Sequence, residues 1–580
     1  MSLGMLFNLL LLIMWAPALL GLGTACYLLL TTVPATRDLH TNTTDPGILI
    51  ILSFVPLAIA STSLHFLIPL GESLSVAALL LGYALLIYHN RVLRQVISAQ
   101  SLLHALLVAI LVCLFASRPL RHFDTGLYHI QSVRWCSSFP LVRGLANLHE
   151  RLGFNSLWTP IAAIVDFPEL SDRSSYPLTC LLLFGFGWAI FDALAGWTDR
   201  GQSIPKLFLA ACGCFWTWLV TTNSHFVTLP SLSTDAPVYL ITFLCVYFLL
   251  RFCAENKPTD LSVAVVLSAL AVTIKVSATP LFVFLLLYGV FLLWRDRLRL
   301  HFRLKIIAFV TIGSLLLLWV ARSVCLSGYL IFPVRATALP FLPWHVPLPM
   351  AKQLVDTLKA WARLPGVSPE IVLESSAWVS VWLKHLSGKY ISYMIAAYGT
   401  LGVCLLLLAG WLGRFPRNFA RFWPAAVMLC LGVIHWFATV PDLRYGCAFL
   451  FALASLILSL GVGSLFRHKV TGVLLCGAAL LPLIAVDDVS HFHFHDLPAI
   501  EKGFASVKQT QQGTPILVVG GDERIWDGPL PSTPYFRPSL VTRRDANGRI
   551  RQFELPEAVH TPYYDRLPAH VRMGLVQEGF

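Results

Sequence analysis

The side chains best suited to chemistry in this chain lie in one short polar segment, residues 121–129, which reads Arg-His-Phe-Asp-Thr-Gly-Leu-Tyr-His and directly follows an apolar run. The carboxylate of Asp124 could act as a general base toward a hydroxyl group or bind a divalent cation. Alternatively, Asp124 could cap a helix that starts at Thr125. The chemical role of Asp124 is favoured by its polar neighbours, which are His122, Tyr128, His129 and Arg134.

Two further charged residues border apolar runs. Asp235 lies in the segment Ser-Leu-Ser-Thr-Asp-Ala-Pro, residues 231–237. This pattern also marks a helix start, where the helix dipole stabilises an Asp, so a site role and a structural role both stay open. Lys275 follows only about fourteen apolar residues, which places its ammonium group near the headgroups of a bilayer. There it either snorkels or holds a lipid phosphate.

Three arginines suit bidentate recognition of a phosphate, although arginines that only contact headgroups are common. They are Arg322, Arg335 and Arg444. Two histidines inside apolar runs, His65 and His435, are expected to be core residues with a hydrogen-bond partner.

The stretch of residues 143–155 is rich in polar groups at helical spacing. Asn147 and Arg151 are four positions apart, as are Arg151 and Asn155. One helix face could therefore present amide and guanidinium donors to a hydroxyl-rich ligand. Arg143 begins the same stretch, and the alternative is the solvated face of an interfacial helix.

The composition defines the environment that these residues share. Of the 580 residues 57% are hydrophobic and only 12% are charged, too few to coat a soluble globule. Apolar runs of about 17–25 residues recur along the chain, and we count about fourteen. We therefore predict an all-α polytopic membrane protein: a bundle of about 14 transmembrane helices, with interfacial helices in the outer loops and a small C-terminal α/β segment outside the membrane.

The net charge of +12 does not imply a nucleic-acid partner, because the basic residues gather in short loops between apolar runs. Such loops instead indicate how the protein is oriented in the membrane. The positive-inside rule places these loops on the cytoplasmic side, with two apolar runs between neighbouring basic loops. The polar segments described above then all fall on the outer side. The predicted division is residues 1–117, N-terminal transmembrane helices; 118–175, an outer loop with interfacial helices and Asp124; 176–322, a transmembrane core; 323–388, an outer loop; 389–487, C-terminal transmembrane helices; and 488–580, an outer C-terminal segment.

Expectations for the outer parts are more local. Tryptophans of the outer loops are expected at the membrane interface, among them Trp135 and Trp158. In the C-terminal segment, residues 514–521 are predicted to form a strand and residues 529–534 an irregular turn. The alternating histidines of residues 491–495 are not expected to bind a metal.

The combination of an outer-face aspartate, interfacial helices behind it, a many-helix body and a C-terminal outer segment resembles the GT-C superfamily of membrane glycosyltransferases. It also looks like a large bacterial family of multi-span membrane proteins. The residues that carry the resemblance are 123–129, 143–155, 233–237, 273–275, 327–329 and 441–445.

This resemblance implies a hexosyl- or pentosyltransferase in a bacterial inner (cytoplasmic) membrane, with its active site and C-terminus on the periplasmic side. It would move a sugar from a polyprenyl-phosphate carrier to a glycan, lipid or protein acceptor. Asp124 would be the catalytic base, and no metal site is assigned, although a divalent cation stays compatible. The lipid phosphate would be held by Lys275, Arg335 and Arg444. The sugar or the acceptor would be bound by His122, Tyr128, His129, Arg134, Arg143, Asn147, Arg151, Asn155 and Asp235.

The sequence departs from the familiar members in two ways. About three apolar runs precede the helix that leads to Asp124, where the familiar members have none. The Trp-Trp-Asp motif of the oligosaccharyltransferases is missing, so that acceptor is not expected. Two alternatives stay open: a transporter or flippase of a lipid-linked or anionic solute, and a polymerase or ligase of lipid-linked glycans.

Overall fold

The structure is a computed structural model that carries all side chains of the residues it describes. These are residues 3–31, 45–118, 120–167, 177–195, 204–222, 229, 231–295, 300–374, 376–387, 389–414, 419–465, 505–521 and 523–555.

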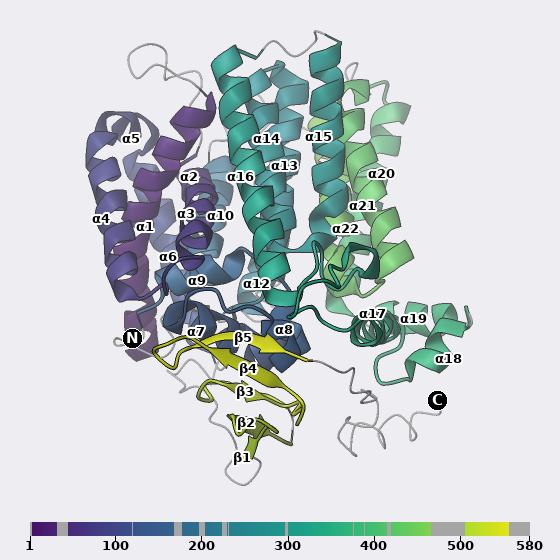
Figure 1. The fold of residues 1–580 in the computed structure, drawn as a ribbon. Coiled ribbons are helices and arrows are strands. Elements are labelled where there is room, and N and C mark those ends of the chain that lie inside the picture. The colour runs from purple at the N-terminus through teal and green to yellow at the C-terminus, as the bar shows by residue number, and fades with distance from the viewer. Residues whose placement is uncertain are drawn as a thin grey trace.

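Long helices run roughly side by side and form the body of the protein (Figure 1). Because a helix pairs its own backbone polar groups, it is the form that such apolar segments take in a bilayer. The helices of the body are α1 (Leu3–Thr31), α2 (Pro46–Leu52), α3 (Phe54–His65), α4 (Glu72–Tyr88), α5 (Asn90–Val96), α6 (Ala99–Ala116), α10 (Pro177–Ala195), α11 (Ile204–Ala211), α12 (Gly213–Thr221), α13 (Asp235–Glu255), α14 (Pro258–Ile274), α15 (Thr279–Trp294), α16 (Phe302–Ser327), α20 (Tyr390–Trp411), α21 (Trp423–Thr439) and α22 (Leu443–Leu465).

The prediction of a polytopic, mostly helical membrane protein is confirmed at this level. Among the described residues 11 helical segments are long and apolar enough to cross a membrane, or up to 12 if α4 and α5, bent by 72°, count as one span. The predicted number of about fourteen is not confirmed. The helix α14 is apolar but shorter, and the last predicted run, before Asp488, lies outside the described residues.

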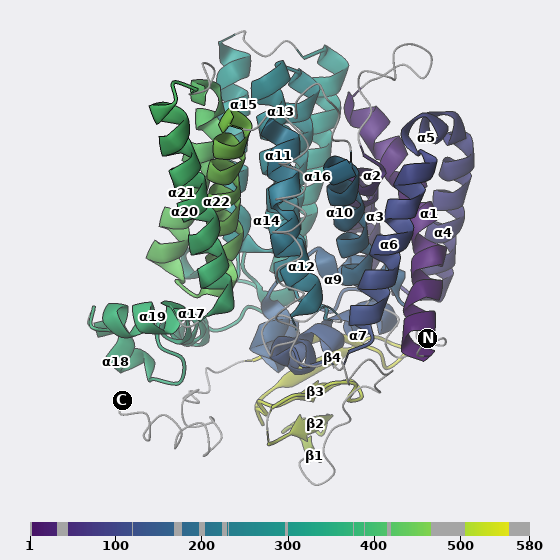
Figure 2. The same cartoon turned by 180° about the vertical axis from the view of Figure 1, so that it is seen from behind.

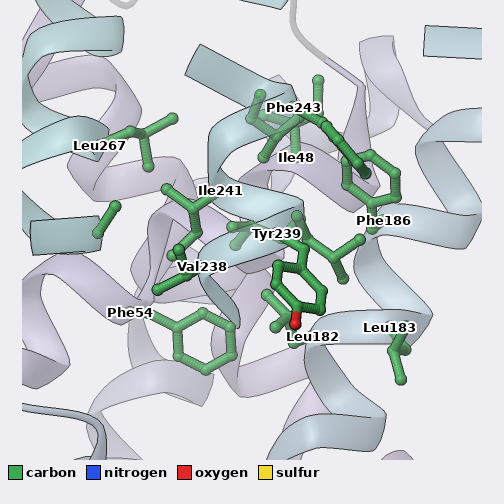
Figure 3. Packing of buried hydrophobic residues seen from close by; sticks show 14 of the residues in the cluster. Ile48, Phe54, Leu182, Leu183, Phe186, Val238, Tyr239, Ile241, Phe243 and Leu267 are labelled. Carbon is green, nitrogen blue, oxygen red and sulfur yellow. The ribbon is translucent and has the colours of Figure 1, made fainter. Parts of the chain in front are cut away.

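The centre of the bundle is α13, whose side chains are buried almost throughout. Figure 3 shows Tyr239, Ile241 and Phe243 of this helix packed among side chains of α2, α3, α10 and α14. The helices α15, α16 and α20 instead carry many exposed apolar side chains, such as Phe309 and Leu317. Such an apolar outer surface is compatible with lipid and costly in water.

Short helices and strands gather at one end of the bundle, at which α13 and α22 begin and α14, α16 and α21 end (Figures 1 and 2). They are a π-helical turn η2 (Thr125–His129), α7 (Ile130–Ser138), α8 (Leu145–Leu148), η3 (Glu150–Gly153), α9 (Trp158–Val165), η4 (Val276–Ala278), η5 (Arg335–Thr337), α17 (Leu348–Arg363), α18 (Pro369–Glu374) and α19 (Trp378–Ser387); η6 (Phe419–Phe422) precedes α21 at the other end. The predicted polar loops therefore do share one end of the molecule.

The short helices α7 and α8 do not lie freely on a membrane surface as predicted. They are sandwiched between the bundle and the C-terminal strands, where Trp135, Leu145 and Leu148 pack against Ile550 and Phe553. The expectation that Trp135 and Trp158 lie at the membrane interface is wrong, since their exposed fractions are 2% and 1%. The strands offer these amphipathic helices an apolar partner inside the protein, which takes the place of lipid.

The C-terminal strands are β1 (Ala505–Gln509), β2 (Pro515–Val519), β3 (Ser532–Thr533), β4 (Val541–Arg544) and β5 (Ile550–Glu554). The strand predicted at residues 514–521 is present as β2, which pairs antiparallel with β1 and parallel with β3. The predicted irregular turn at residues 529–534 was wrong in part, because it contains β3. Residues 505–521 and 523–555 contain strands and no helix. Of the predicted C-terminal α/β segment, these residues therefore show only the strands. Residues 491–495, with their histidines, lie outside the described residues.

Candidate active site

A cavity of about 440 Å³ lies at the strand-bearing end of the bundle. Its wall comes from η2, α7, η3 and α9, from the starts of α13 and α22, from the junction of α14 and α15, and from the ends of α16 and α21. The cavity brings together most of the predicted site residues, although they are far apart in the sequence. Those that line it are Asp124, Tyr128, His129, Arg151, Asn155, Asp235, Lys275 and Arg444.

Four of these residues form a row of alternating charges, which we call the charge chain: Asp124, Arg444, Asp235 and Lys275. Nη2 of Arg444 lies 3.0 Å from Oδ2 of Asp124, and its Nε lies 3.1 Å from Oδ2 of Asp235. The other carboxylate oxygen of Asp235 pairs with the ammonium group of Lys275. The formal charges of the chain cancel, which allows four ionised groups to share a largely buried site.

Each member of the charge chain stands at the end of a helix. Asp235 is the first residue of α13, and Arg444 is the second residue of α22, where its backbone N–H donates to Oδ1 of Asp442 over 2.9 Å. Lys275 ends α14 in an extended conformation before α15 begins at Thr279. Helix ends at one edge of a bundle thus place charges side by side without burying them at the middle of the membrane.

In the structure Asp235 has both of the roles that the sequence left open, the helix start and the site residue. Its backbone N–H donates to Oγ of Ser233 over 3.2 Å, and the same hydroxyl donates to Oδ2 of Asp235 over 3.1 Å. These contacts belong to the start of α13, whereas its carboxylate also holds Arg444 and Lys275. Asp235 therefore both begins the helix and fixes the two cations of the site.

Asp124 does not act as a helix cap, since its side chain makes no capping hydrogen bond to the turn that follows. The turn Thr125–His129 is π-helical, a form often found at functional sites. Burial alone would raise the pKa of the Asp124 carboxyl, but the nearby Arg444 guanidinium and then His122 and His129 outweigh burial and hold this pKa below its ordinary value. Asp124 is consequently a carboxylate at neutral pH.

Two histidines lie beside Asp124 and share one hydroxyl group. Oγ1 of Thr125 is 3.1 Å from Nδ1 of His122 and 3.2 Å from Nδ1 of His129, and the two rings stack with centroids 5.6 Å apart. The backbone N–H of Thr125 donates to Nδ1 of His122. Burial lowers the pKa of His122 to about 4 and that of His129 to about 3. Both rings are therefore neutral at pH 7; His129 lines the cavity and His122 is buried behind it.

These histidines predict a loss of stability in mild acid. Below the unfolded-state pKa of about 6.5 the unfolded chain binds protons at these two positions that the folded chain does not bind. The contribution of His122 to stability therefore falls between about pH 6.5 and pH 4, and that of His129 falls down to about pH 3. We expect the Tm to drop over this range and to drop less in His122→Asn, whose amide oxygen can still accept from Thr125. The control is His385→Gln on the exposed face of α19. An equal drop in His122→Asn and wild type would contradict the assignment.

Several cavity residues were missed or misjudged from the sequence. Tyr445 packs its ring 4.3 Å from Nζ of Lys275, and its hydroxyl accepts from Nη2 of Arg444 over 3.0 Å. His435, expected to be a core residue, lines the cavity from α21 together with Thr439. Their spacing of four positions, which puts two polar groups on one helix face, was the signal that could have identified them.

Other predicted site residues hold the surrounding structure together and do not line the cavity. Arg134 donates to the backbone oxygens of Asp527 and Gly528, and Asn147 donates to those of Trp344 and Phe553. The structure thus gives Arg134, Arg143 and Asn147 a different place from the predicted one. Arg143 stacks on the Trp344 ring at 5.0 Å and pairs its backbone with β5. All three contact the C-terminal segment or the outer loop of residues 323–388. For Arg143 and Asn147 the sequence could not show this, because a helix side that faces protein has the same spacing of polar residues as one that faces a ligand.

Two predicted phosphate-binding arginines are also placed differently. Arg335 is exposed on the turn η5, next to the cavity-lining Val334 but outside the cavity. Arg322 is buried, and its Nη1 donates to Oδ1 of Asn155 over 2.7 Å. That bond orients the Asn155 amide at the cavity wall. As to a divalent cation, the described part of the chain contains no group of three or more His, Cys, Asp or Glu residues that could hold one.

Fold and cavity together define a multi-pass helical membrane protein with an ionised cavity at one end of its bundle. The chain belongs to the family described as a domain of unknown function (DUF8201), whose sequence model matches residues 5–451. No curated protein matches the chain. The matched part contains the whole charge chain, whereas the C-terminal strands lie beyond it.

Proposed function

We propose that the protein is a GT-C-type glycosyltransferase that moves a sugar from a polyprenyl-phosphate carrier to a glycan, lipid or protein acceptor. The observation that carries the proposal is the pairing of Asp124 with Arg444 in a cavity where transmembrane helices end. In the proposal the protein resides in a bacterial inner membrane and the cavity opens on the periplasmic side.

The lining of the cavity suits an amphiphilic donor. Lys275, Arg444 and Arg151 place three cationic groups around it, which favours a phosphate. Much of the remaining wall is apolar and suits a prenyl chain; it includes Ile274, Trp319, Phe332, Val334, Leu358, Trp436 and Val440. A lipid whose anionic head meets the cations while its tail follows the apolar wall would use both parts of the surface.

The proposed reaction uses the same residues. The acceptor hydroxyl gives its proton to the Asp124 carboxylate while its oxygen forms a bond to the anomeric carbon. The bond from that carbon to the phosphate oxygen breaks, and the electron pair leaves with the phosphate. Lys275 and Arg444 stabilise the negative charge that develops there.

The charge chain couples donor binding to the basicity of Asp124. While Arg444 pairs with Asp124, the carboxylate is a weak base because its pKa is low. A donor phosphate that draws Arg444 toward itself weakens this pair, and the pKa of Asp124 then rises toward the range of an effective base. Donor binding thus prepares the base for the acceptor.

The deciding experiment is a transfer assay with the purified full-length chain in lipid nanodiscs. Polyprenyl-phosphate-linked hexoses and pentoses serve as donors, and glycan, lipid and peptide acceptors are supplied in turn. We expect release of polyprenyl phosphate together with a glycosylated acceptor. Binding of the donors without turnover for any acceptor would argue against a transferase.

Lys275 gives a more specific expectation. In Lys275→Gln a charge-assisted contact to the donor phosphate is lost, while Asp235 keeps Arg444 as its partner. We expect KM for the donor to rise about 10- to 100-fold, the equivalent of one hydrogen bond to a charged group. Lys305→Gln is the matched control, since Lys305 is exposed near the start of α16 at the opposite end of the bundle. An unchanged KM in Lys275→Gln would exclude Lys275 from the phosphate site.

One observation favours a transporter or flippase as the second candidate. In the membrane-spanning helices α6 and α10, Nδ1 of His104 lies 2.6 Å from Oδ1 of Asp192, and Ser101 donates to Oδ2 of Asp192 over 2.6 Å. Ionisable residues within such helices often mark a transport path. Both residues stand toward the helix ends opposite the cavity, however, and bind each other. Donor movement across liposomes without sugar transfer would favour this candidate, whereas joining of two lipid-linked glycans would favour a polymerase or ligase.

A further inference from the structure

A loop of the C-terminal segment, Glu523–Gly528, lies directly against the turn that follows Asp124. We call it the Trp526 loop. The backbone N–H groups of Ile525 and Trp526 both donate to the carbonyl oxygen of Gly126 over 2.9 Å. The Trp526 side chain is 3% exposed and belongs to the same apolar core as the transmembrane helices. The loop is thus built into the bundle next to the site.

Gly126 is shaped to receive this loop. A Cβ atom at this position would lie 2.8 Å from the Trp526 ring, closer than real Cβ contacts. Its backbone is part of a helical turn, which other residues adopt readily. The glycine is therefore required by the close approach of the Trp526 ring and not by its own backbone conformation.

The following helix α7 holds the other side of the loop. Nε2 of Gln131 donates to the carbonyl oxygens of Trp526 and Gly528 over 3.1 and 2.8 Å, and its Oε1 accepts from Ser532 of β3 over 3.0 Å. Trp526 also has a φ of +47°, in the left-handed region that non-glycine residues seldom adopt. Such a backbone persists where its surroundings fix it, and here the partners are η2 and α7.

We infer that the Trp526 loop positions Asp124 and the turn that follows it, which carries Tyr128 and His129, with Trp526 as the positioning residue. The loop comes from the part of the chain beyond the family match, yet it contacts the turn whose side chains line the cavity. The C-terminal segment accordingly helps to hold the site in shape. The expected effect of the loop on catalysis rests on the proposed function. The positioning of the turn by the loop does not.

A double-mutant cycle on Gly126 and Trp526 tests the inference in the full-length protein. Gly126→Ala puts a methyl group against the ring and displaces the loop; Trp526→Ala removes the ring. In each single variant we expect faster hydrogen exchange of residues 125–131. In the double variant the methyl group enters the space that the ring has vacated. Gly126→Ala should therefore cause no further increase in the exchange rate when Trp526 is already Ala. Equal effects of Gly126→Ala in both backgrounds would overturn the inference.

Kinetics provide the second measurement. We expect Trp526→Ala to lower kcat about 100-fold, the effect of a catalytic group displaced by about 1 Å, while KM for the donor stays within about threefold because Lys275 stands on another element. Trp526→Phe, which keeps a ring against Gly126, should restore most of kcat. A parallel rise in KM, or failure of Trp526→Phe to recover kcat, would contradict a positioning role. If wild type transfers no sugar, the proposed function fails. The hydrogen-exchange measurements on the Gly126 and Trp526 variants still test whether the loop positions the turn, so the two failures can be distinguished.

Discussion

Asp124→Asn is expected to leave the fold intact and to lower kcat for sugar transfer by about 10²- to 10⁴-fold, the usual contribution of a positioned general base. Asparagine has the shape of aspartate and can still accept a hydrogen bond from Arg444, but it cannot take the acceptor proton. Arg444 also keeps its second carboxylate partner, Asp235, so it is not left as an unpaired buried charge.

The same variant makes a prediction for KM that separates a base from a binding residue. In wild type the Asp124 carboxylate pairs with Arg444, so a donor phosphate of the proposed reaction would have to compete with it for this arginine. Its removal should leave KM for the donor unchanged or lower it. Asp356→Asn is the control, because Asp356 pairs with Lys352 on the outer surface of α17. Unchanged kcat in Asp124→Asn would eliminate Asp124 as the base, and a raised KM with normal kcat would make it a binding residue.

The sequence allowed the general form of the site to be predicted because helix ends carry local signals. Asp235 stands in a helix-start pattern, and Lys275 follows an apolar run too short to cross the bilayer. The alternation of basic loops placed both residues and Asp124 at the same end of the bundle. Burial of apolar runs and the cost of a charge in hydrocarbon determine these features, and both act over a few residues.

Pairing within the site could not be predicted in the same way. Asp124 and Arg444 are 320 positions apart, and which carboxylate meets which cation depends on the packing of whole helices. The sequence suggested cations free to hold a phosphate, whereas in the structure Arg444 and Lys275 are already paired with carboxylates. The pairing of both cations with carboxylates is thus a property that only the assembled site shows.

The placement of residues 143–155 was missed for a related reason. The helical spacing of Asn147 and Arg151 indicates a polar face but not what that face contacts. In the structure Arg151 reaches the cavity, whereas Asn147 donates to a backbone oxygen of β5, 406 positions along the chain. Contacts between an outer loop and a distant strand leave no periodic trace in either segment.

Arg444→Gln is expected to have the largest effect on stability of any substitution in the cavity. It leaves Asp124 without its ion-pair partner and removes one of the two cations that hold Asp235. Removing one member of a buried ion pair costs about 3–5 kcal/mol in free energy of unfolding. Unfolding in mixed micelles would measure the loss, with Arg421→Gln as control, an arginine in η6 at the opposite end of the bundle.

The double variant Arg444→Gln/Asp124→Asn separates the charge of Asp124 from the shape of the site. With the uncompensated carboxylate gone and Asp235 still paired with Lys275, most of the lost stability should return, since two neutral amides can hydrogen-bond where the ions did. Sugar transfer should stay absent, because both the base and a phosphate ligand are missing. If the double variant is as unstable as Arg444→Gln, the Asp124–Arg444 pair is not what holds this end of the bundle together. If it transfers sugar, the charge chain is not the catalytic centre.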